Sequence, residues 1–174
     1  MTLVVLLGGA RSGKSGLAVE LAGVTGCAVT FVATGEARDA EMAARIELHR
    51  SSRPSRWTTV EEPVELARAV HDVDPARTLL VDCLSLWVAN LLERGETAND
   101  IERDAASVAA VAAGRPGRTI AVSNEVGLGI VPATPLGRVY RDVLGRVNAA
   151  WVSAAGEAFF VVAGRALRLE TVVP

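Results

Sequence analysis

Near its start the chain reads Leu3-Val4-Val5-Leu6-Leu7, followed at once by Gly8-Gly9-Ala10-Arg11-Ser12-Gly13-Lys14-Ser15. The second run fits the spacing G-x-x-x-x-G-K-[ST], which is that of a phosphate-binding loop, or P-loop. The short apolar run before it is typical of a buried strand, and residues 15–22 have helical spacing. Strand, loop and helix together are the context that the motif requires. The sequence therefore predicts that residues 8–15 bind the phosphates of a nucleotide.

The residue types in this run suit that task. Small residues let the backbone N–H groups wrap a phosphate, and the following helix N-terminus adds partial positive charge. Lys14 is the one lysine among 18 basic residues, and a compact ammonium reaches the β- and γ-phosphates. The Ser15 hydroxyl can ligate Mg²⁺. The alternative is a glycine-rich turn that joins a strand to a helix and binds nothing.

A carboxylate that could share the metal follows another apolar run, Thr78-Leu79-Leu80-Val81, at Asp82. Ligands bind at the carboxyl ends of parallel strands. We therefore expect Asp82, on a strand neighbouring the first, to hold Mg²⁺ together with Ser15. Asp82 could also cap a helix that begins near Leu84, and the two roles are compatible.

Apolar runs alternate with helical patterns along the whole chain. This alternation predicts an α/β fold, a P-loop NTPase-like, mostly parallel sheet flanked by helices, in a single domain over residues 1–174. The last two strands are compatible with an antiparallel hairpin at the sheet edge. Helices are expected at 15–22, 39–52, 65–70, 84–92, 101–113 and 136–155. Strands are expected at 3–7, 28–33, 57–60, 78–81, 119–122, 159–162 and 167–172.

Composition excludes several classes of protein. A net charge of −2 argues against a general nucleic-acid binder. Cys27 and Cys83, with His49 and His71, lack the spacing of a zinc site or a disulfide framework. No apolar stretch approaches the length of a membrane span, and the N-terminus lacks the pattern of a signal peptide. A cytoplasmic globular protein is expected.

A P-loop alone does not distinguish a kinase from a switch or a motor. A GTPase switch would need the guanine-reading motif N-K-x-D, which this chain cannot contain because Lys14 is its one lysine. A motor would need a longer chain than 174 residues. A transferase acting on a small molecule remains. A monofunctional small-molecule kinase and a nucleotide-binding regulatory protein are the alternatives.

Further blocks follow the loop in order: Val32-Ala33-Thr34, Arg45-Ile46-Glu47-Leu48-His49, Asp82-Cys83-Leu84 and Ser123-Asn124-Glu125-Val126-Gly127. With the loop, they resemble the bifunctional adenosylcobinamide kinase / adenosylcobinamide-phosphate guanylyltransferase family of cobalamin biosynthesis. The resemblance implies that ATP or GTP phosphorylates adenosylcobinamide, with Mg²⁺. GMP then passes from GTP to adenosylcobinamide phosphate through a guanylylated histidine, giving adenosylcobinamide-GDP and pyrophosphate. It also implies a homotrimer.

In this resemblance the guanylylated position is His49. A neutral imidazole nitrogen is a good nucleophile toward an α-phosphorus, and histidine supplies that form near neutral pH. The nearby Arg45, Arg50 and Arg53 can neutralise the triphosphate and the departing pyrophosphate. Spacing alone favours a plainer interpretation, in which His49 merely ends the apolar stripe of Met42 and Ile46. The resemblance favours the catalytic role.

The resemblance also implies further nucleotide contacts. They form three groups: a turn after the second strand, the residues just beyond His49, and two acidic positions. At one acidic position the alignment can match either Glu61 or Glu62. A simple loop and a solvated helix end are the alternatives for the first two groups. The segment 123–127 is a candidate substrate contact or lid, outside the assigned site. The implied contacts are Ala33, Thr34, Gly35, Arg50, Ser51, Ser52, Arg53, Glu61 and Asp82.

Overall fold

A computed structural model describes residues 2–51 and 53–171 of the chain. The strands are β1 (Leu3–Gly8), β2 (Val29–Ala33), β3 (Thr58–Glu61), β4 (Thr78–Asp82), β5 (Thr119–Asn124), β6 (Glu157–Val162) and β7 (Arg165–Arg168). The helices are α1 (Lys14–Gly23), α2 (Ala40–Ser51), α3 (Leu66–Asp72), α4 (Leu84–Glu93), α5 (Ala98–Gly114) and α6 (Pro135–Ala154).

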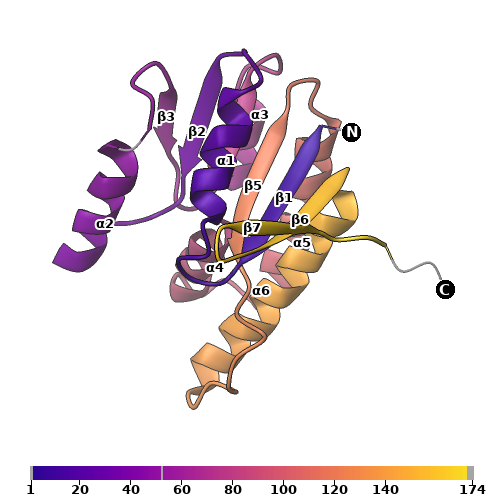
Figure 1. Cartoon of the computed structure of the whole chain (residues 1–174). Coiled ribbons are helices and arrows are strands. Elements are labelled where there is room, and N and C mark those ends of the chain that lie inside the picture. Colours follow the sequence, from indigo (N-terminus) through magenta and orange to yellow (C-terminus); the bar gives the residue numbers. More distant parts are fainter. Residues whose placement is uncertain (1, 52, 172–174) are drawn as a thin grey trace.

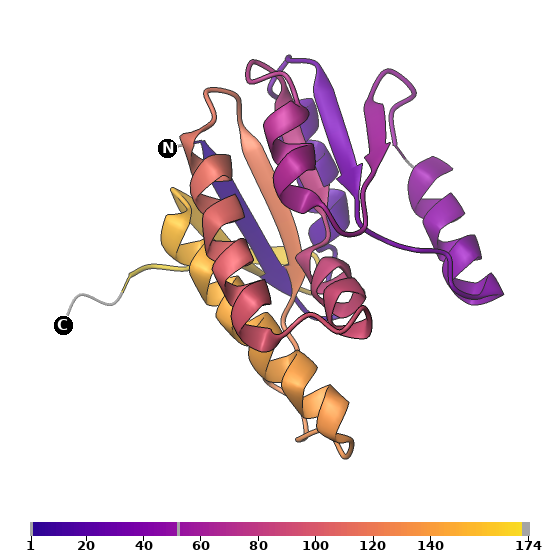
Figure 2. The same cartoon turned by 180° about the vertical axis from the view of Figure 1, so that it is seen from behind.

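The strands form one seven-stranded sheet in the order β3-β2-β4-β5-β1-β6-β7. Every pairing is parallel except that of β6 with β7. Helix α1 lies on one face, and α3, α5 and α6 lie on the other (Figures 1 and 2). The predicted α/β class with a mostly parallel sheet between helices is confirmed.

Strand β1 lies inside the sheet and is buried on both faces. Val4 and Leu6 pack in the cluster that includes Ala18 and Ala22 of α1. Leu3, Val5 and Leu7 pack in the larger cluster on the opposite face. A strand covered on both sides needs apolar residues at every position, which explains its continuous apolar run.

The three tryptophans lie in the core. Trp87 and Trp151 are 2% and 0% exposed, and Trp57 is 8% exposed. On α6, Val143, Leu144 and Val147 point into the same core as Trp151. Core packing therefore accounts for the apolar residues in the second half of this helix.

The chain's last strand was predicted at the wrong residues. The expected strand 167–172 is in fact β7, at Arg165–Arg168, although the antiparallel edge hairpin with β6 is confirmed. Ala163 and Gly164 both have positive φ, 49° and 73°, so they form a tight turn and the chain reverses directly after Val162. Every residue of β7 is exposed. The ends of β7 are therefore set by its backbone pairing at the sheet edge, and they cannot be recognised from apolar residues.

This hairpin turn lies against the phosphate-binding loop. The backbone N–H of Gly164 donates a 2.9 Å hydrogen bond to the carbonyl of Ser12. Gly13 has a φ of 97°, and a Cβ there would lie 3.3 Å from the Cα of Gly164. Glycine is therefore required at position 13 by conformation, and the space beside it is already occupied.

Gly8 is required for a different reason, which gives a testable prediction. A Cβ on Gly8 would clash with the carbonyl oxygen of Val161 and lie 2.7 Å from Ser12 Oγ. We expect Gly8→Ala to lower the free energy of unfolding by about 2 kcal/mol, because the backbone of β6 must move. Urea unfolding followed by circular dichroism measures this change.

Gly16→Ala is the matched control, since a Cβ there meets nothing within 4 Å. It should leave stability unchanged or raise it by about 0.5 kcal/mol. Equal losses of stability in both variants would contradict the steric explanation for Gly8.

Within residues 2–51 and 53–171, the helices are all too short or too polar to pass through a bilayer.

Candidate functional site

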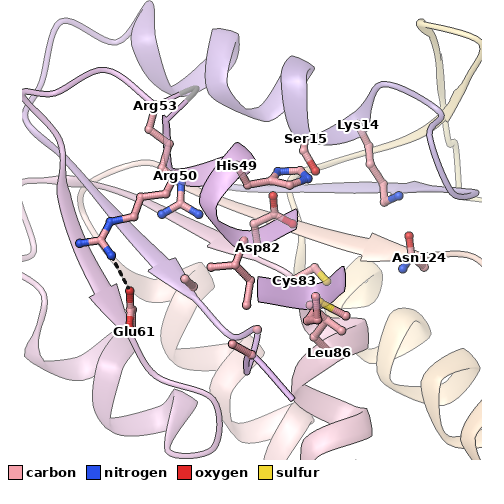
Figure 3. A pocket seen from close by; sticks show the side chains of 15 residues that line it. Lys14, Ser15, His49, Arg50, Arg53, Glu61, Asp82, Cys83, Leu86 and Asn124 are labelled. Atoms are coloured by element: carbon pink, nitrogen blue, oxygen red, sulfur yellow. Dashed lines mark ion pairs between the residues drawn. The ribbon is translucent and has the colours of Figure 1, made fainter. Parts of the chain in front are cut away.

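A cavity opens at the carboxyl ends of the central strands, between α1, α2 and α4 (Figure 3). The phosphate-binding loop, α2 and the ends of β4 and β5 each contribute side chains to it. Its lining is polar on the side of the loop and apolar on the side of α4. The lining residues are Lys14, Ser15, Ala33, Gly35, Ala37, Met42, Ile46, His49, Arg50, Arg53, Glu61, Asp82, Cys83, Leu86 and Asn124.

Lys14, Ser15 and Asp82 come together on the polar side. Lys14 is buried, and its ammonium donates a 2.9 Å hydrogen bond to the carbonyl of Gly9 within the loop. The Ser15 hydroxyl is hydrogen-bonded to the carboxyl group of Asp82. The expectation that Asp82 lies on the strand next to β1 is wrong, because β5 separates β1 from β4. The start of α1 projects across the end of β5, so Ser15 still reaches Asp82.

The surroundings of Asp82 disfavour its charge. Burial raises the pKa of this carboxyl group, and the hydrogen bond from Ser15 and the nearby basic side chains offset that rise only in part. His49, Lys14 and Arg53 are the basic residues concerned. A carboxylate that burial makes costly to ionise is suited to a partner that brings positive charge.

Asp82 does not cap the helix that follows it. Cys83 is the N-cap residue of α4, and no side chain caps that helix. Thr34 instead binds the backbone between β4 and α4. Its hydroxyl donates a 2.7 Å hydrogen bond to the carbonyl of Cys83 and accepts a 2.9 Å hydrogen bond from the N–H of Cys83. Thr34 is fully buried. Its hydroxyl therefore positions the end of β4 and does not line the cavity.

His49 enters the cavity from α2. Asp39, directly before this helix, caps it by accepting a 2.7 Å hydrogen bond from the N–H of Met42. Met42, Ile46 and His49 lie on the same helix face and all line the cavity. The His49 ring lies close to Ser15 and Asp82 in Figure 3, and His49 is one of the basic residues that lower the pKa of the Asp82 carboxyl group. The apolar stripe and the imidazole thus belong to one wall.

Two arginines beyond His49 also face the cavity. Arg50 forms a 3.6 Å ion pair with Glu61 of β3. The Arg53 guanidinium lies 3.5 Å from the centroid of the Phe31 ring, and burial lowers its pKa. Glu62 points elsewhere, since its carboxylate accepts hydrogen bonds from the N–H groups of Val64 and Glu65 and from Arg68. Glu61 is therefore the acidic residue of this pair that lines the cavity.

Helix α2 lies apart from the other helices, beyond the edge of the sheet (Figure 1). Ion pairs hold the segment that leads into it against α4. Glu36 bonds to Arg94 at 2.5 Å and to Arg38 at 2.9 Å, and Arg38 also pairs with Glu93. Hydrogen bonding from Arg94, above all, lowers the pKa of Glu36. These contacts position the helix that carries His49.

Some predicted contacts do not line the cavity. Residues 8–13 form the loop between β1 and α1, whose backbone the sequence predicts to bind a phosphate, and they are not among the residues that line the cavity. Ser51 is exposed and its hydroxyl donates to the carbonyl of Leu48. Ser52 lies outside the described residues.

Other lining residues were not assigned to the site from the sequence. Ala37 and Leu86 carry no chemistry that a sequence pattern would single out, and Cys83 is buried with its pKa raised to about 11 by burial. Asn124 was noted only within the segment 123–127. The sequence shows that Asn124 ends a strand, which is a common place for a site residue. Only the strand order shows that this strand lies between β1 and β4.

Known proteins resemble this chain over nearly its whole length. The family model described as "Cobinamide kinase / cobinamide phosphate guanyltransferase" matches residues 4–169. The "Bifunctional adenosylcobalamin biosynthesis protein CobP" of Pseudomonas aeruginosa is 45% identical over 168 residues, covering 95% of this chain and 96% of that protein. The "Bifunctional adenosylcobalamin biosynthesis protein CobU" of Escherichia coli K12 is 38% identical over 181 residues, covering 97% and 99%.

Among solved structures, that of the RadB recombinase matches with a TM-score of 0.51 and 17% identity, covering 91% of this chain and 73% of the recombinase. At that identity the likeness concerns the fold alone. The family match and the curated relatives span nearly the full chain, so they establish its membership. The chain belongs to the cobinamide kinase / cobinamide phosphate guanyltransferase family, and it is an enzyme of that family.

Proposed function

We propose that this chain catalyses both reactions in one cavity: phosphorylation of adenosylcobinamide by ATP or GTP, and transfer of GMP from GTP to the resulting phosphate through His49. One observation carries the proposal. The His49 imidazole lines the same cavity as Lys14 and the Ser15–Asp82 pair. A nucleophile and a triphosphate-binding loop in one cavity are what a histidine-linked nucleotidyl transfer requires.

In the first reaction the hydroxyl of the aminopropanol arm attacks the γ-phosphorus, and the bond from that phosphorus to the bridging oxygen breaks. The loop amides and Lys14 bind the phosphates and counter the charge that moves onto the leaving diphosphate. Ser15 and Asp82 supply hard oxygen ligands beside the loop, which suit Mg²⁺ bound jointly with phosphates. When bound, Mg²⁺ would neutralise phosphate charge.

In the second reaction a ring nitrogen of His49 attacks the α-phosphorus of GTP, and pyrophosphate leaves. A phosphate oxygen of adenosylcobinamide phosphate then attacks the same phosphorus, and the histidine leaves as a neutral imidazole. Arg50 and Arg53, which line the cavity beside His49, are positioned to neutralise the departing pyrophosphate. We assign nucleotide contacts also to Glu61 and to the turn 33–35, because they adjoin these residues.

Mass spectrometry after incubation with GTP and Mg²⁺ tests the covalent step. Trypsin cuts after Arg45 and Arg50, so it releases the short peptide Ile46–Arg50, whose one histidine is His49. The expected result is a GMP adduct on this peptide that is lost in acid. A monofunctional kinase would phosphorylate adenosylcobinamide without forming the adduct. A regulatory nucleotide-binding protein would bind GTP without consuming it when adenosylcobinamide is supplied.

We also propose that the chain assembles into a homotrimer in the cytoplasm, where both nucleotides are available. Apolar side chains support self-association on the segment that precedes α6 and on the first turns of that helix. The exposed residues are Leu128 (80%), Ile130 (97%), Val131 (61%), Leu136 (58%) and Val139 (44%). A surface with this many neighbouring exposed apolar side chains is typical of a protein contact.

Sedimentation equilibrium tests the assembly. The wild type should have three times the chain mass of 18.2 kDa, and Ile130→Asp should shift it toward the monomer, because a charge would be buried in the contact. Val24→Asp is the control, since Val24 is also exposed (76%) but lies at the far end of α1. A monomeric wild type would contradict the proposal.

A further inference from the structure

Asn124 ends β5, the strand that lies between the loop-bearing β1 and the Asp82-bearing β4. Its backbone is aligned with Gly8 in the β1–β5 pairing, and the N–H of Glu125 donates to the Gly8 carbonyl at 3.0 Å. Asn124 lines the cavity with Lys14 and Asp82. It therefore occupies the place between the group that binds the phosphates and the carboxylate that accompanies them.

The amide group of Asn124 has a defined orientation. Its Nδ2 donates a 3.0 Å hydrogen bond to the hydroxyl of Ser85, which is 1% exposed and is bonded in turn to Cys83 Sγ at 2.9 Å. Its backbone carbonyl accepts a 3.0 Å hydrogen bond from Asn148 of α6. With Nδ2 turned toward Ser85, the amide oxygen faces the opposite side, toward Lys14 in Figure 3.

An amide oxygen in this place accepts hydrogen bonds and repels phosphate oxygens. It is therefore unsuited to holding the nucleotide. A hydroxyl group attacking the γ-phosphorus must approach from the side opposite the diphosphate. Asn124, at the end of β5, lines the cavity into which such a hydroxyl must come. Such a hydroxyl can donate a hydrogen bond. An acceptor beside it would orient the hydroxyl so that the lone pair of its oxygen points at the phosphorus.

We propose that Asn124 is a catalytic residue of the phosphorylation step, whose amide oxygen accepts a hydrogen bond from the attacking hydroxyl of the alcohol substrate. Ser85 is a positioning residue that acts through it by holding Nδ2. The amide does not take the proton. It orients the hydroxyl while the oxygen–phosphorus bond forms and the bond from that phosphorus to the leaving diphosphate breaks, and the hydroxyl proton passes to an oxygen of the transferred phosphoryl group. This inference rests on the proposed function, because it assigns Asn124 to one of the two reactions and not to the other.

The test measures the two steps separately in the full-length chain. Asn124→Ala should lower kcat/KM for phosphorylation of adenosylcobinamide by about 50-fold. Acid-labile labelling by α-labelled GTP, and the Kd of a fluorescent nucleotide analogue, should stay within about twofold of the wild type. Ser85→Ala, which releases Nδ2 but keeps the amide, should lower phosphorylation by about fivefold with the same nucleotide Kd.

Asn99→Ala is the matched control, because Asn99 is an exposed residue of α5 outside the cavity. An unchanged rate of phosphorylation in Asn124→Ala would overturn the inference, and so would a parallel fall in labelling or in nucleotide affinity. If Asn124→Ala does not fold, Ser85→Ala tests the inference through the same comparison of phosphorylation rate with nucleotide Kd. If the wild type forms no GTP-derived label, the proposed second reaction is contradicted. Asn124 is still tested in that case, by comparing the effect of Asn124→Ala on the phosphorylation rate with its effect on the nucleotide Kd.

Discussion

Replacing His49 with alanine should abolish labelling of the chain by α-labelled GTP, a loss of at least about 10³-fold in rate, because no other group would attack the α-phosphorus. Phosphorylation of adenosylcobinamide should stay within about threefold of the wild type. His49 lies on α2, whereas the loop and Asp82 belong to α1 and β4. Removing the imidazole therefore leaves the phosphate-binding side of the cavity in place.

His71→Ala is the matched control for this change. His71 is the chain's other histidine, and its side chain is 83% exposed beside Asp72. It should label as the wild type does. Persistent labelling of His49→Ala would assign the nucleophile to another residue, and a loss of both reactions would make His49 a nucleotide-binding or structural residue.

Replacing Asp82 with asparagine should have two effects of opposite sign. Both reactions should fall by about 10²- to 10³-fold, because the metal site would lose its carboxylate. The nucleotide-free protein should gain about 1 kcal/mol of stability at pH 7, which corresponds to about 2–4 °C in Tm. The gain follows from removal of a carboxylate whose charge is disfavoured by burial.

The sign of the stability change follows from the direction of the pKa shift. Burial raises the pKa of Asp82 in the folded state above its unfolded value near 4. The contribution of this group is therefore most favourable below the unfolded pKa, and it falls as pH rises through the folded pKa. The difference in Tm between Asp82→Asn and the wild type should shrink as pH is lowered toward 4.

Thermal unfolding at several pH values, without nucleotide or metal, measures this dependence. Asp104→Asn is the control, because the Asp104 side chain is 60% exposed on α5. It should change Tm little at any pH. A lower Tm for Asp82→Asn at pH 7 would show that the carboxylate's interactions with Ser15 and the nearby cations outweigh its burial.

Local pattern was sufficient for much of the fold. The apolar run at 3–7 and the loop motif at 8–15 predict β1, the loop and α1 because strand burial and glycine spacing are properties of neighbouring residues. The edge hairpin was predicted, but the ends of β7 were not. That strand is exposed and held by backbone pairing, so no apolar pattern marks where it begins.

The candidate site divides in the same way. Local sequence named the loop residues and Asp82, and the family resemblance named His49 and Glu61. Neither the local sequence nor the resemblance could predict that Asp82 lies two strands away from β1. Neither could predict that Glu62 bonds to the start of α3, or that the hydroxyl of Thr34 is buried at the end of β4. Each of these depends on contacts between residues far apart in the chain.

By itself, then, the sequence determined the class of fold and predicted the phosphate-binding loop, because both are written in short runs whose spacing has a direct physical meaning. The family resemblance, and not spacing, indicated the kind of chemistry. The tertiary structure decided which side chains share a cavity. The strand order places β5, which ends at Asn124, between β1 and β4, and the ion pairs of Glu36 and Arg38 link the segment before α2 to the end of α4. Distances across a sheet depend on strand order, which no local run of residues specifies.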